Sequence, residues 1–157
     1  MAFSESLLEK VNKIISTHET KQSALIPVLR EVQIERGYLS SDTMQEVADI
    51  LELPPSNVQN VASFYTMFFR KPVGKHVIWL CRTLACALKG AEHAEHYMCD
   101  KLGIKMGETT ADGKITLMEA ECLAACGTAP VLLVDDDLME NLTKEKIDKL
   151  IEEIGKY

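Results

Sequence analysis

Residues 76–86 (HVIWLCRTLAC) and residues 115–126 (ITLMEAECLAAC) decide the fold of this chain. Each stretch begins with a short apolar run of strand type and continues into a loop that carries two cysteines. Ligands of α/β folds usually lie at the carboxyl ends of the strands. If the two strands are parallel neighbours, both cysteine pairs reach the same edge of the sheet. The sequence therefore predicts one shared site for Cys81, Cys86, Cys122 and Cys126.

The segments around these stretches predict a small α/β domain. A mostly helical segment runs from Thr83 to Leu102 and ends at Gly103, and Thr143 caps a last helix. The expected strands cover residues 76–80, 115–118 and 131–134, with a brief fourth strand near Leu138 after a turn at 135–137. This order of strand, helix, strand, hairpin and helix is compatible with an α/β sandwich.

The first half of the chain has helical periodicity. Four short helices are expected, over about residues 3–15, 23–36, 42–51 and 56–68. Pro27 is tolerated in the first turn of the second helix, and Gly37 suits the C-terminal cap of that helix. The sequence Ser56-Asn57-Val58-Gln59 predicts a capping box at the start of the fourth helix. The aromatic residues that follow, Phe64, Tyr65 and Phe68, are expected mainly in a core that the four helices share.

A boundary is expected at Arg70-Lys71-Pro72-Val73-Gly74, where proline and glycine interrupt a basic patch. The chain is therefore predicted to form two domains. Residues 1–72 make a small helical bundle, and residues 73–157 make the α/β domain that carries the cysteines.

Composition and charge exclude several classes of protein. The chain has 157 residues, 46% hydrophobic and 26% charged, and no apolar run approaches the roughly 18 to 20 residues that span a bilayer. Its N-terminal stretch is typical of a helix start and not of a signal peptide. The net charge of −7 argues against binding to nucleic acid. A cytosolic, reducing setting is expected, in which cysteines are metal ligands or reactive thiols more often than disulfides.

The spacing of the cysteines suits an iron–sulfur cluster. Two irons bridged by sulfide need two thiolates each, which two short cysteine pairs on separate loops supply. Small residues within and after the pairs leave room for a cluster and let backbone N–H groups approach its sulfurs. They are Ala85, Ala124, Ala125 and Gly127.

Spacing alone leaves other interpretations open. A structural zinc site with four cysteines tolerates the same short pairs, and an interaction module folded around zinc is a rival of a different class. A thiol–disulfide enzyme is disfavoured because the chain has no Cys-x-x-Cys, and a disulfide is the weakest interpretation in a cytosolic chain.

The other candidate ligands have structural explanations. Cys99 stands alone in the long helix, where a cysteine is most often a small core residue. His93 and His96 have acidic neighbours and are expected on a solvated face. Trp79 is expected to pack into the sheet core, and the aspartates at 135–137 are explained by an acidic hairpin turn. The chain has no Gly-x-Gly-x-x-Gly and no Walker loop, so any dinucleotide or flavin chemistry must lie in another chain.

The whole cysteine pattern resembles the thioredoxin-like [2Fe–2S] ferredoxins. The pattern is Cys81-x4-Cys86, a gap of 35 residues, then Cys122-x3-Cys126 followed by Ala129-Pro130-Val131. The chain is similar over nearly its full length to the small iron–sulfur subunit of respiratory NADH:quinone oxidoreductase (complex I). The similarity includes Gly37-Tyr38-Leu39, Val61-Ala62-Ser63-Phe64-Tyr65, Gly107-Glu108-Thr109-Thr110, Glu121-Cys122-Leu123 and Glu140-Asn141-Leu142-Thr143.

The resemblance implies a thioredoxin-like fold and one [2Fe–2S] cluster held by Cys81, Cys86, Cys122 and Cys126. It implies a non-catalytic subunit of an NADH dehydrogenase that exchanges single electrons with the FMN of a partner flavoprotein, which also binds NADH. Further iron–sulfur subunits are the other expected partners. The expected location is cytoplasmic, peripheral to the inner face of the cell membrane, without insertion into it. The helical bundle is the candidate docking face for the flavoprotein.

Equivalent subunits of NAD(P)-linked hydrogenases and formate dehydrogenases share this ligand pattern and are the alternative. Two details differ from the respiratory pattern. Ala124 stands where glycine is common, and Arg82-Thr83-Leu84-Ala85 replaces an interval richer in Thr and Pro. Thioredoxin-like folds also carry a cis-proline before the third strand, which directs attention to the peptide bond of Pro130.

Overall fold

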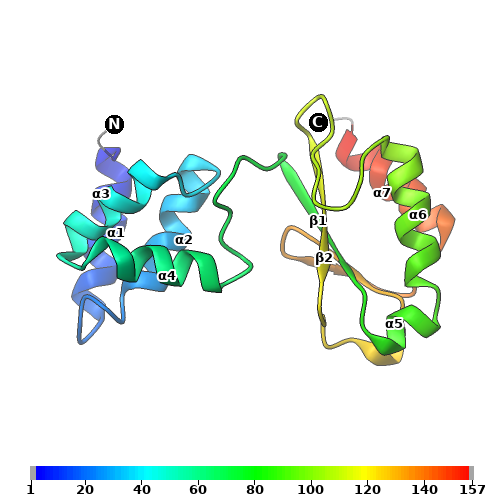
Figure 1. Cartoon of the computed structure of the whole chain (residues 1–157), viewed down its shortest axis with the longest axis horizontal. Coiled ribbons are helices and arrows are strands. Elements are labelled where there is room, and N and C mark those ends of the chain that lie inside the picture. The colour runs from blue at the N-terminus through cyan, green and yellow to red at the C-terminus, as the bar shows by residue number, and fades with distance from the viewer. Residues whose placement is uncertain (1–2, 156–157) are drawn as a thin grey trace. The chain divides into compact units, whose positions relative to one another are not determined.

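The chain divides between Pro72 and Val73 into two compact units, which we call unit 1 (residues 1–72) and unit 2 (residues 73–157) (Figure 1). The computed structural model describes residues 3–155. Each unit has its own cluster of buried apolar side chains. Each is described below by itself.

Unit 1 is formed by four helices within the described residues. They are α1 (Glu5–Thr17), α2 (Leu25–Arg36), α3 (Ser41–Leu51) and α4 (Pro55–Phe64). Serine side chains cap two of them: the Ser4 hydroxyl accepts a hydrogen bond from the Leu7 N–H, and the Ser40 hydroxyl accepts one from the Thr43 N–H. Gly37 ends α2 with a φ of 80°, which glycine adopts at low cost. The four helices expected from the sequence are thus present.

The prediction of a capping box at Ser56 was wrong. The fourth helix begins one residue earlier, at Pro55, with Pro54 at the cap position and no side-chain hydrogen bond to cap it. Proline suits the first helical position because its φ is already helical and its missing N–H would have no intrahelical partner there. Ser56 therefore lies inside the first turn. The helix also ends before Tyr65, earlier than expected.

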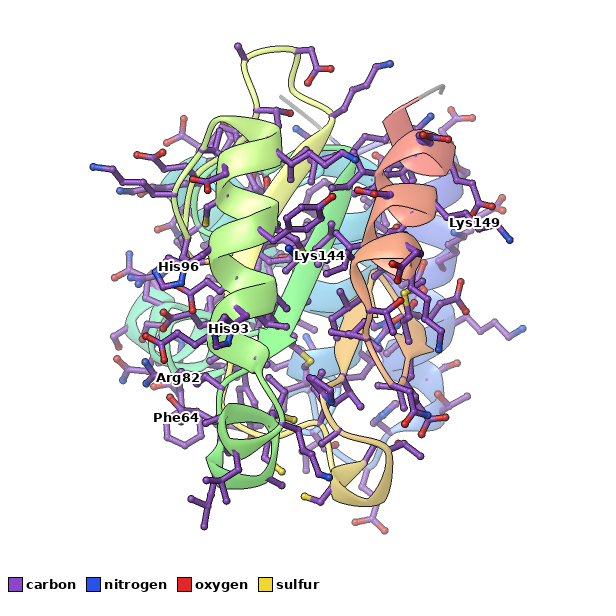
Figure 2. All side chains as sticks on the ribbon, turned by 90° about the vertical axis from the view of Figure 1, so that its right-hand side faces the viewer. Phe64, Arg82, His93, His96, Lys144 and Lys149 are labelled. Carbon is purple, nitrogen blue, oxygen red and sulfur yellow. The ribbon has the colours of Figure 1, made fainter. Side chains whose placement is uncertain are left out.

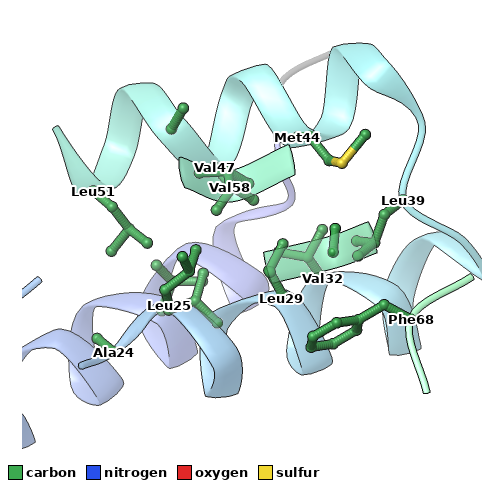
Figure 3. Close-up of a cluster of buried hydrophobic side chains, with 14 of the residues drawn as sticks. Ala24, Leu25, Leu29, Val32, Leu39, Met44, Val47, Leu51, Val58 and Phe68 are labelled. Atoms are coloured by element: carbon green, nitrogen blue, oxygen red, sulfur yellow. The ribbon is translucent and has the colours of Figure 1, made fainter. Parts of the chain in front are cut away.

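The core of unit 1 gathers the inward faces of all four helices (Figure 3). Leu29 and Val32 of α2 pack with Val47 of α3 and Val58 of α4, and all four side chains are fully buried. Phe68 joins this core from beyond the end of α4 (Figure 3). Phe64, by contrast, is 79% exposed, so the expectation of a shared aromatic core holds for Phe68 and fails for Phe64.

Unit 2 is built on a four-stranded mixed sheet in the order β2-β1-β3-β4. Its strands are β1 (His76–Cys81), β2 (Ile115–Ala120), β3 (Leu132–Val134) and β4 (Asp137–Met139). Strands β1 and β2 are parallel, with Cys81 opposite Ala120. Strand β3 is antiparallel to β1 and forms a hairpin with β4. The expectation of parallel neighbours is thereby confirmed.

Helices α6 (Ala91–Leu102) and α7 (Lys144–Gly155) lie side by side on one face of this sheet (Figure 1, Figure 2). A short helix, α5 (Leu84–Leu88), precedes α6. The segment from Thr83 to Leu102 is therefore two helices and not one. Gly90 separates them with a φ of 95°, a left-handed conformation that interrupts the helical backbone.

The sheet core lies under α6 and α7. Ile78 and Leu80 of β1 pack there against Met98 of α6 and Ile147 of α7. Because side chains alternate along a strand, Trp79 points to the opposite face of the sheet and is only half-buried. The expectation that Trp79 packs into the sheet core was therefore wrong.

Candidate metal centre

The two cysteine pairs follow the carboxyl ends of the two parallel strands. Cys81 is the last residue of β1 and Cys86 lies in α5, whereas Cys122 comes two residues after β2 and Cys126 begins a short 3-10 helix, η1 (Cys126–Thr128). The parallel pairing of β1 with β2 sends both loops to one end of the sheet, where α5 and η1 lie (Figure 1). The loops that carry the four cysteines thus lie at one end of the sheet, as expected for parallel neighbouring strands.

Burial divides the four cysteines into an inner pair and an outer pair. Cys81 and Cys86 are 2% and 1% exposed and pack with Ala91 and Val131. Cys122 and Cys126 are exposed. All of the cysteines are free thiols. A metal group at this edge would have one side within the protein and the other at its surface.

Hydrogen bonds surround the sulfurs. The Thr83 hydroxyl lies 3.3 Å from the Cys81 sulfur, and the Ala124 N–H donates to the Cys122 sulfur over 3.4 Å. Backbone hydrogen bonding from Leu123 and Val131 lowers the pKa of Cys81 and of Cys86 respectively. Donors of this kind stabilise negative charge on sulfur, which is the state in which cysteine binds metal.

The two inner thiols differ in acidity. Burial raises the pKa of the Cys81 thiol, but hydrogen bonds, chiefly from Thr83 and also from Leu123, outweigh it and leave that pKa below its ordinary value. Burial is the largest cause of a raised pKa at Cys86, with further contributions from its contact with Cys81 and from the charge of Cys126. A metal group bound at these sulfurs would offset such repulsion, because thiolates bind metal in their charged form.

Within residues 3–155, no three His, Cys, Asp or Glu side chains stand close enough together to hold one metal ion. A [2Fe–2S] cluster makes a different demand, because each of its two irons takes two thiolates from the protein. The inner pair, Cys81 and Cys86, meets that demand most nearly, since both thiols are buried in one cluster and each shifts the pKa of the other.

The other candidate ligands lie away from this edge. Cys99 is half-buried in α6 against the sheet core, and burial raises its pKa. His93 and His96 lie on the outer side of α6 (Figure 2), as expected. Asp135 bonds the Val77 N–H and the His76 ring, which gives the acidic turn a structural role.

Three features near the cysteines were not anticipated from the sequence. Thr83 bonds the Cys81 sulfur, and Arg82 bonds Glu119 in β2 and Glu121 in the loop that follows β2. Ala124 has a φ of 58°, in the left-handed region. The only signal for them was that Arg82, Thr83 and Ala124 lie where the sequence departs from the family pattern.

The peptide bond between Ala129 and Pro130, just before β3, is cis. This is the bond to which the resemblance to thioredoxin-like folds directed attention. Val131, the next residue, packs against the inner cysteines. The cis bond therefore lies on the segment that borders the site from the side of β3.

Comparison with known proteins supports the resemblance seen in the sequence. The family described as thioredoxin-like [2Fe–2S] ferredoxin matches residues 11–155. An NADH-quinone oxidoreductase subunit of Rickettsia felis is 44% identical over 149 residues, which cover 94% of this chain and 89% of that protein. The corresponding NADH-quinone oxidoreductase subunit of Escherichia coli (strain K12) is 37% identical, with 92% of this chain and 87% of that protein covered.

A eukaryotic relative and a solved structure add to this. The mitochondrial NADH dehydrogenase [ubiquinone] flavoprotein 2 of Dictyostelium discoideum is 40% identical over 97% of this chain and 63% of that protein. An NAD+-reducing [NiFe]-hydrogenase in the air-oxidized state matches the structure with a TM-score of 0.71 and 27% identity. That match covers 81% of this chain but 22% of the hydrogenase chain, so it concerns one part of the larger protein.

None of the helices described in residues 3–155 has the length and apolar character needed to cross a membrane. The family match spans both units, and the relatives align over almost the whole chain. The [2Fe–2S] cluster expected from the sequence is the cofactor by which the matching family is named. The chain belongs to the thioredoxin-like [2Fe–2S] ferredoxin family, and these NADH-quinone oxidoreductase subunits are among its relatives.

Proposed function

We propose that this chain is an electron-transfer subunit that holds one [2Fe–2S] cluster through Cys81, Cys86, Cys122 and Cys126. The observation that carries the proposal is the parallel pairing of β1 with β2, which sends both cysteine loops to one sheet edge. Cys81 and Cys86 would bind one iron, and Cys122 and Cys126 the other. When bound, the cluster supplies reversible one-electron chemistry.

The chain's own residues bind and shield this group. The buried Cys81 and Cys86, with Ala91 and Val131 around them, keep water from the inner side. The Thr83 hydroxyl and the backbone groups that bond the sulfurs stabilise thiolate charge and tune the reduction potential. The outer pair faces solvent, where an electron partner can approach.

The proposed electron partner is the FMN of an NADH-oxidising flavoprotein subunit in an NADH:quinone oxidoreductase. The names of the curated relatives support this assignment, and further iron–sulfur subunits would complete the complex. The chain would have no substrate site of its own. Its place would be the cytoplasmic side of the cell membrane, held there by the other subunits.

Unit 1 is the proposed docking region for the flavoprotein. Leu7 and Val11 of α1 are buried in the core of unit 1, so α1 offers only its charged outer face. Phe64 at the end of α4 is exposed, and Tyr65 follows it at 38% exposure. Alanine at Phe64 and Tyr65 should weaken copurification with the flavoprotein, and unchanged binding would remove α4 from the docking face.

A second candidate is the equivalent subunit of an NAD-linked hydrogenase. The structural match to an NAD+-reducing [NiFe]-hydrogenase favours it. Both assignments share the cluster and the electron transfer, and they differ in the parent complex. The chains that copurify with this one from its native host distinguish them.

Serine substitutions test the ligand assignment. Each of Cys81→Ser, Cys86→Ser, Cys122→Ser and Cys126→Ser should lower the cluster content after anaerobic reconstitution, because a hydroxyl is a poorer ligand for iron than a thiolate. Cys99→Ser is the matched control and should keep the wild-type content, since Cys99 lies in α6. Full cluster content in any of the four variants would contradict the assignment of that residue.

A further inference from the structure

Arg82 joins the two loops that carry the cysteines. It directly follows Cys81, and its backbone N–H donates to the carbonyl of Ala120 at the end of β2. Its guanidinium donates to Glu119 Oε2 over 2.8 Å and to Glu121 Oε1 over 2.6 Å. We call these three side chains, Arg82, Glu119 and Glu121, the Arg82 clamp. One side chain of the first loop thus holds the end of β2, at Glu119, and the start of the second loop, at Glu121.

The loop that carries Cys122 and Cys126 is less constrained by its own structure than the loop that carries Cys81 and Cys86. Cys81 and Cys86 are buried on a strand and a helix, whereas Cys122 and Cys126 are exposed and follow the last residue of β2. Between Ala120 and η1 the backbone has no regular structure, so few backbone hydrogen bonds fix it. Glu121 directly precedes Cys122, and its ion pair with Arg82 ties this segment to the first loop.

The Arg82 clamp contributes little to global stability, because its members are 52%, 42% and 78% exposed and exposed ion pairs are weak. Its effect is local. A planar guanidinium bonding two carboxylates fixes direction as well as distance, which a lysine ammonium cannot do. The Arg82 clamp therefore acts on where the outer loop sits and not on whether unit 2 folds.

We propose that Arg82 is a positioning residue, which locks the Cys122 loop against the Cys81 loop and so holds the outer cysteines in place for the cluster. The role in cluster binding rests on the proposed function; the lock between the loops does not. Arg82 bears one positive charge against two negative charges on the glutamates, so the Arg82 clamp also sets the charge beside the site. The effect of Arg82 on the position of the Cys122 loop can be separated from its effect on local charge by comparing Arg82→Gln with Glu121→Gln, because the two variants change the charge in opposite directions.

Hydrogen exchange of the full chain without cluster tests the lock alone. Arg82→Gln and Glu121→Gln should each speed exchange of the amides of residues 119–126 by roughly twofold to fivefold, in line with the loss of exposed ion pairs. Lys89→Gln, which removes a positive charge near α5 but leaves the Arg82 clamp intact, should leave these amides unchanged. Unchanged exchange in Arg82→Gln would overturn the proposal, whatever the chain binds.

Cluster release and reduction potential test the consequence for the site. Arg82→Gln and Glu121→Gln should both release the cluster to a chelator about tenfold faster, the low end for residues that support metal ligands. Their potentials should shift in opposite directions, more negative for Arg82→Gln and more positive for Glu121→Gln. The double variant should restore the wild-type potential, since its net charge is unchanged, but should still release the cluster fast.

Arg82→Lys should keep the wild-type potential and restore only part of the slow release. Wild-type release rates in both single variants would overturn the positioning role, even if the potentials moved. A chain that takes up no cluster at all would contradict the proposed function instead, and the hydrogen-exchange result would still decide whether the loops are locked.

Discussion

The four cysteines of the candidate centre have unequal surroundings. Cys81 combines burial with several hydrogen bonds, and the bonds prevail, so its pKa lies below the ordinary value. Cys86 is equally buried but has a raised pKa. Burial raises the pKa of both thiols; at Cys81 hydrogen bonds outweigh it, whereas at Cys86 the contact with Cys81 and the charge of Cys126 add to it.

Ala124, between the outer cysteines, has a backbone conformation that does not suit it. Its φ of 58° is in the left-handed region, which costs an L-residue roughly 1–2 kcal/mol. Ala124→Gly should remove this cost, and the greater freedom of glycine in the unfolded chain should offset part of the gain. The free energy of unfolding of unit 2, measured with denaturant, should rise by about 0.5–1 kcal/mol.

The neighbouring alanine provides the control. Ala125 has a φ of −117°, which any residue adopts, and its methyl group is partly buried beside the inner cysteines. Ala125→Gly should therefore lower the free energy of unfolding. If both glycine variants destabilised the chain equally, strain at Ala124 would not be the cause.

At the residue scale, the sequence predicted where the cysteines lie in the fold better than what surrounds them. Cys81 and Cys122 were assigned to strand ends because apolar runs precede them, and local pattern is enough for that. The bonds from Arg82 to Glu119 and Glu121 join residues 37 and 39 positions apart. No local pattern encodes such pairs, because they depend on the register in which β1 and β2 meet.

At the scale of elements, the ends of the helices differ most from those that the sequence predicts. The pattern Ser56-Asn57-Val58-Gln59 predicts a cap at Ser56, but α4 begins at Pro55, because the fixed φ of proline suits the first helical position. The composition of the segment from Thr83 to Leu102 is helical throughout and predicts one helix. Gly90 divides it, which brings Cys86 into a short helix of its own.

One polar cluster ties α6 to α7. The Lys101 ammonium and the Tyr97 hydroxyl of α6 both donate to Asp148 Oδ1 of α7, the Tyr97 hydroxyl over 2.6 Å. These bonds, that of Lys101 first, lower the pKa of the Asp148 carboxyl below its ordinary value of 3.8. A carboxyl with a lowered pKa stabilises the folded chain above its ordinary pKa, and this contribution is lost as the pH falls through the lowered value.

Asp148→Asn should therefore reduce the free energy of unfolding of unit 2 near neutral pH. Its difference from wild type should shrink as the pH falls from 3.8 through the lowered pKa, where the carboxyl of the folded wild-type chain becomes protonated. Denaturant titrations of both proteins, at neutral pH and at a pH below 3.8, measure this difference. Glu153→Gln, in the same helix, breaks only a long exposed contact of 3.8 Å with Lys149 and should change little. A constant effect of Asp148→Asn at all pH values would contradict the assignment.

At the scale of the whole molecule, the described buried clusters each fall within one unit. The cysteines, the sheet and the helices that cover it all lie in unit 2. A core that is complete within one segment is the usual condition for independent folding. The sequence predicted this division from the change of periodicity and from Pro72 and Gly74, although the docking role of unit 1 stays a prediction.

Residues 73–157 expressed alone should therefore fold and unfold in one cooperative transition. They should also take up as much iron per chain as the full protein on anaerobic reconstitution, because all four proposed ligands are present. Copurification with the flavoprotein should be lost, because unit 1 is missing. A fragment without a cooperative transition would show that unit 2 depends on unit 1 for its fold.

The central claim is that the four cysteines hold a two-iron cluster. It is tested most directly by iron and sulfide analysis of the anaerobically purified full chain, with EPR spectra before and after reduction by dithionite. We expect two irons and two sulfides per chain, as the cluster composition requires, no signal when oxidised and one S = 1/2 signal when reduced. A colourless chain that holds zinc, and takes up no iron on reconstitution, would contradict the claim and favour a structural zinc module.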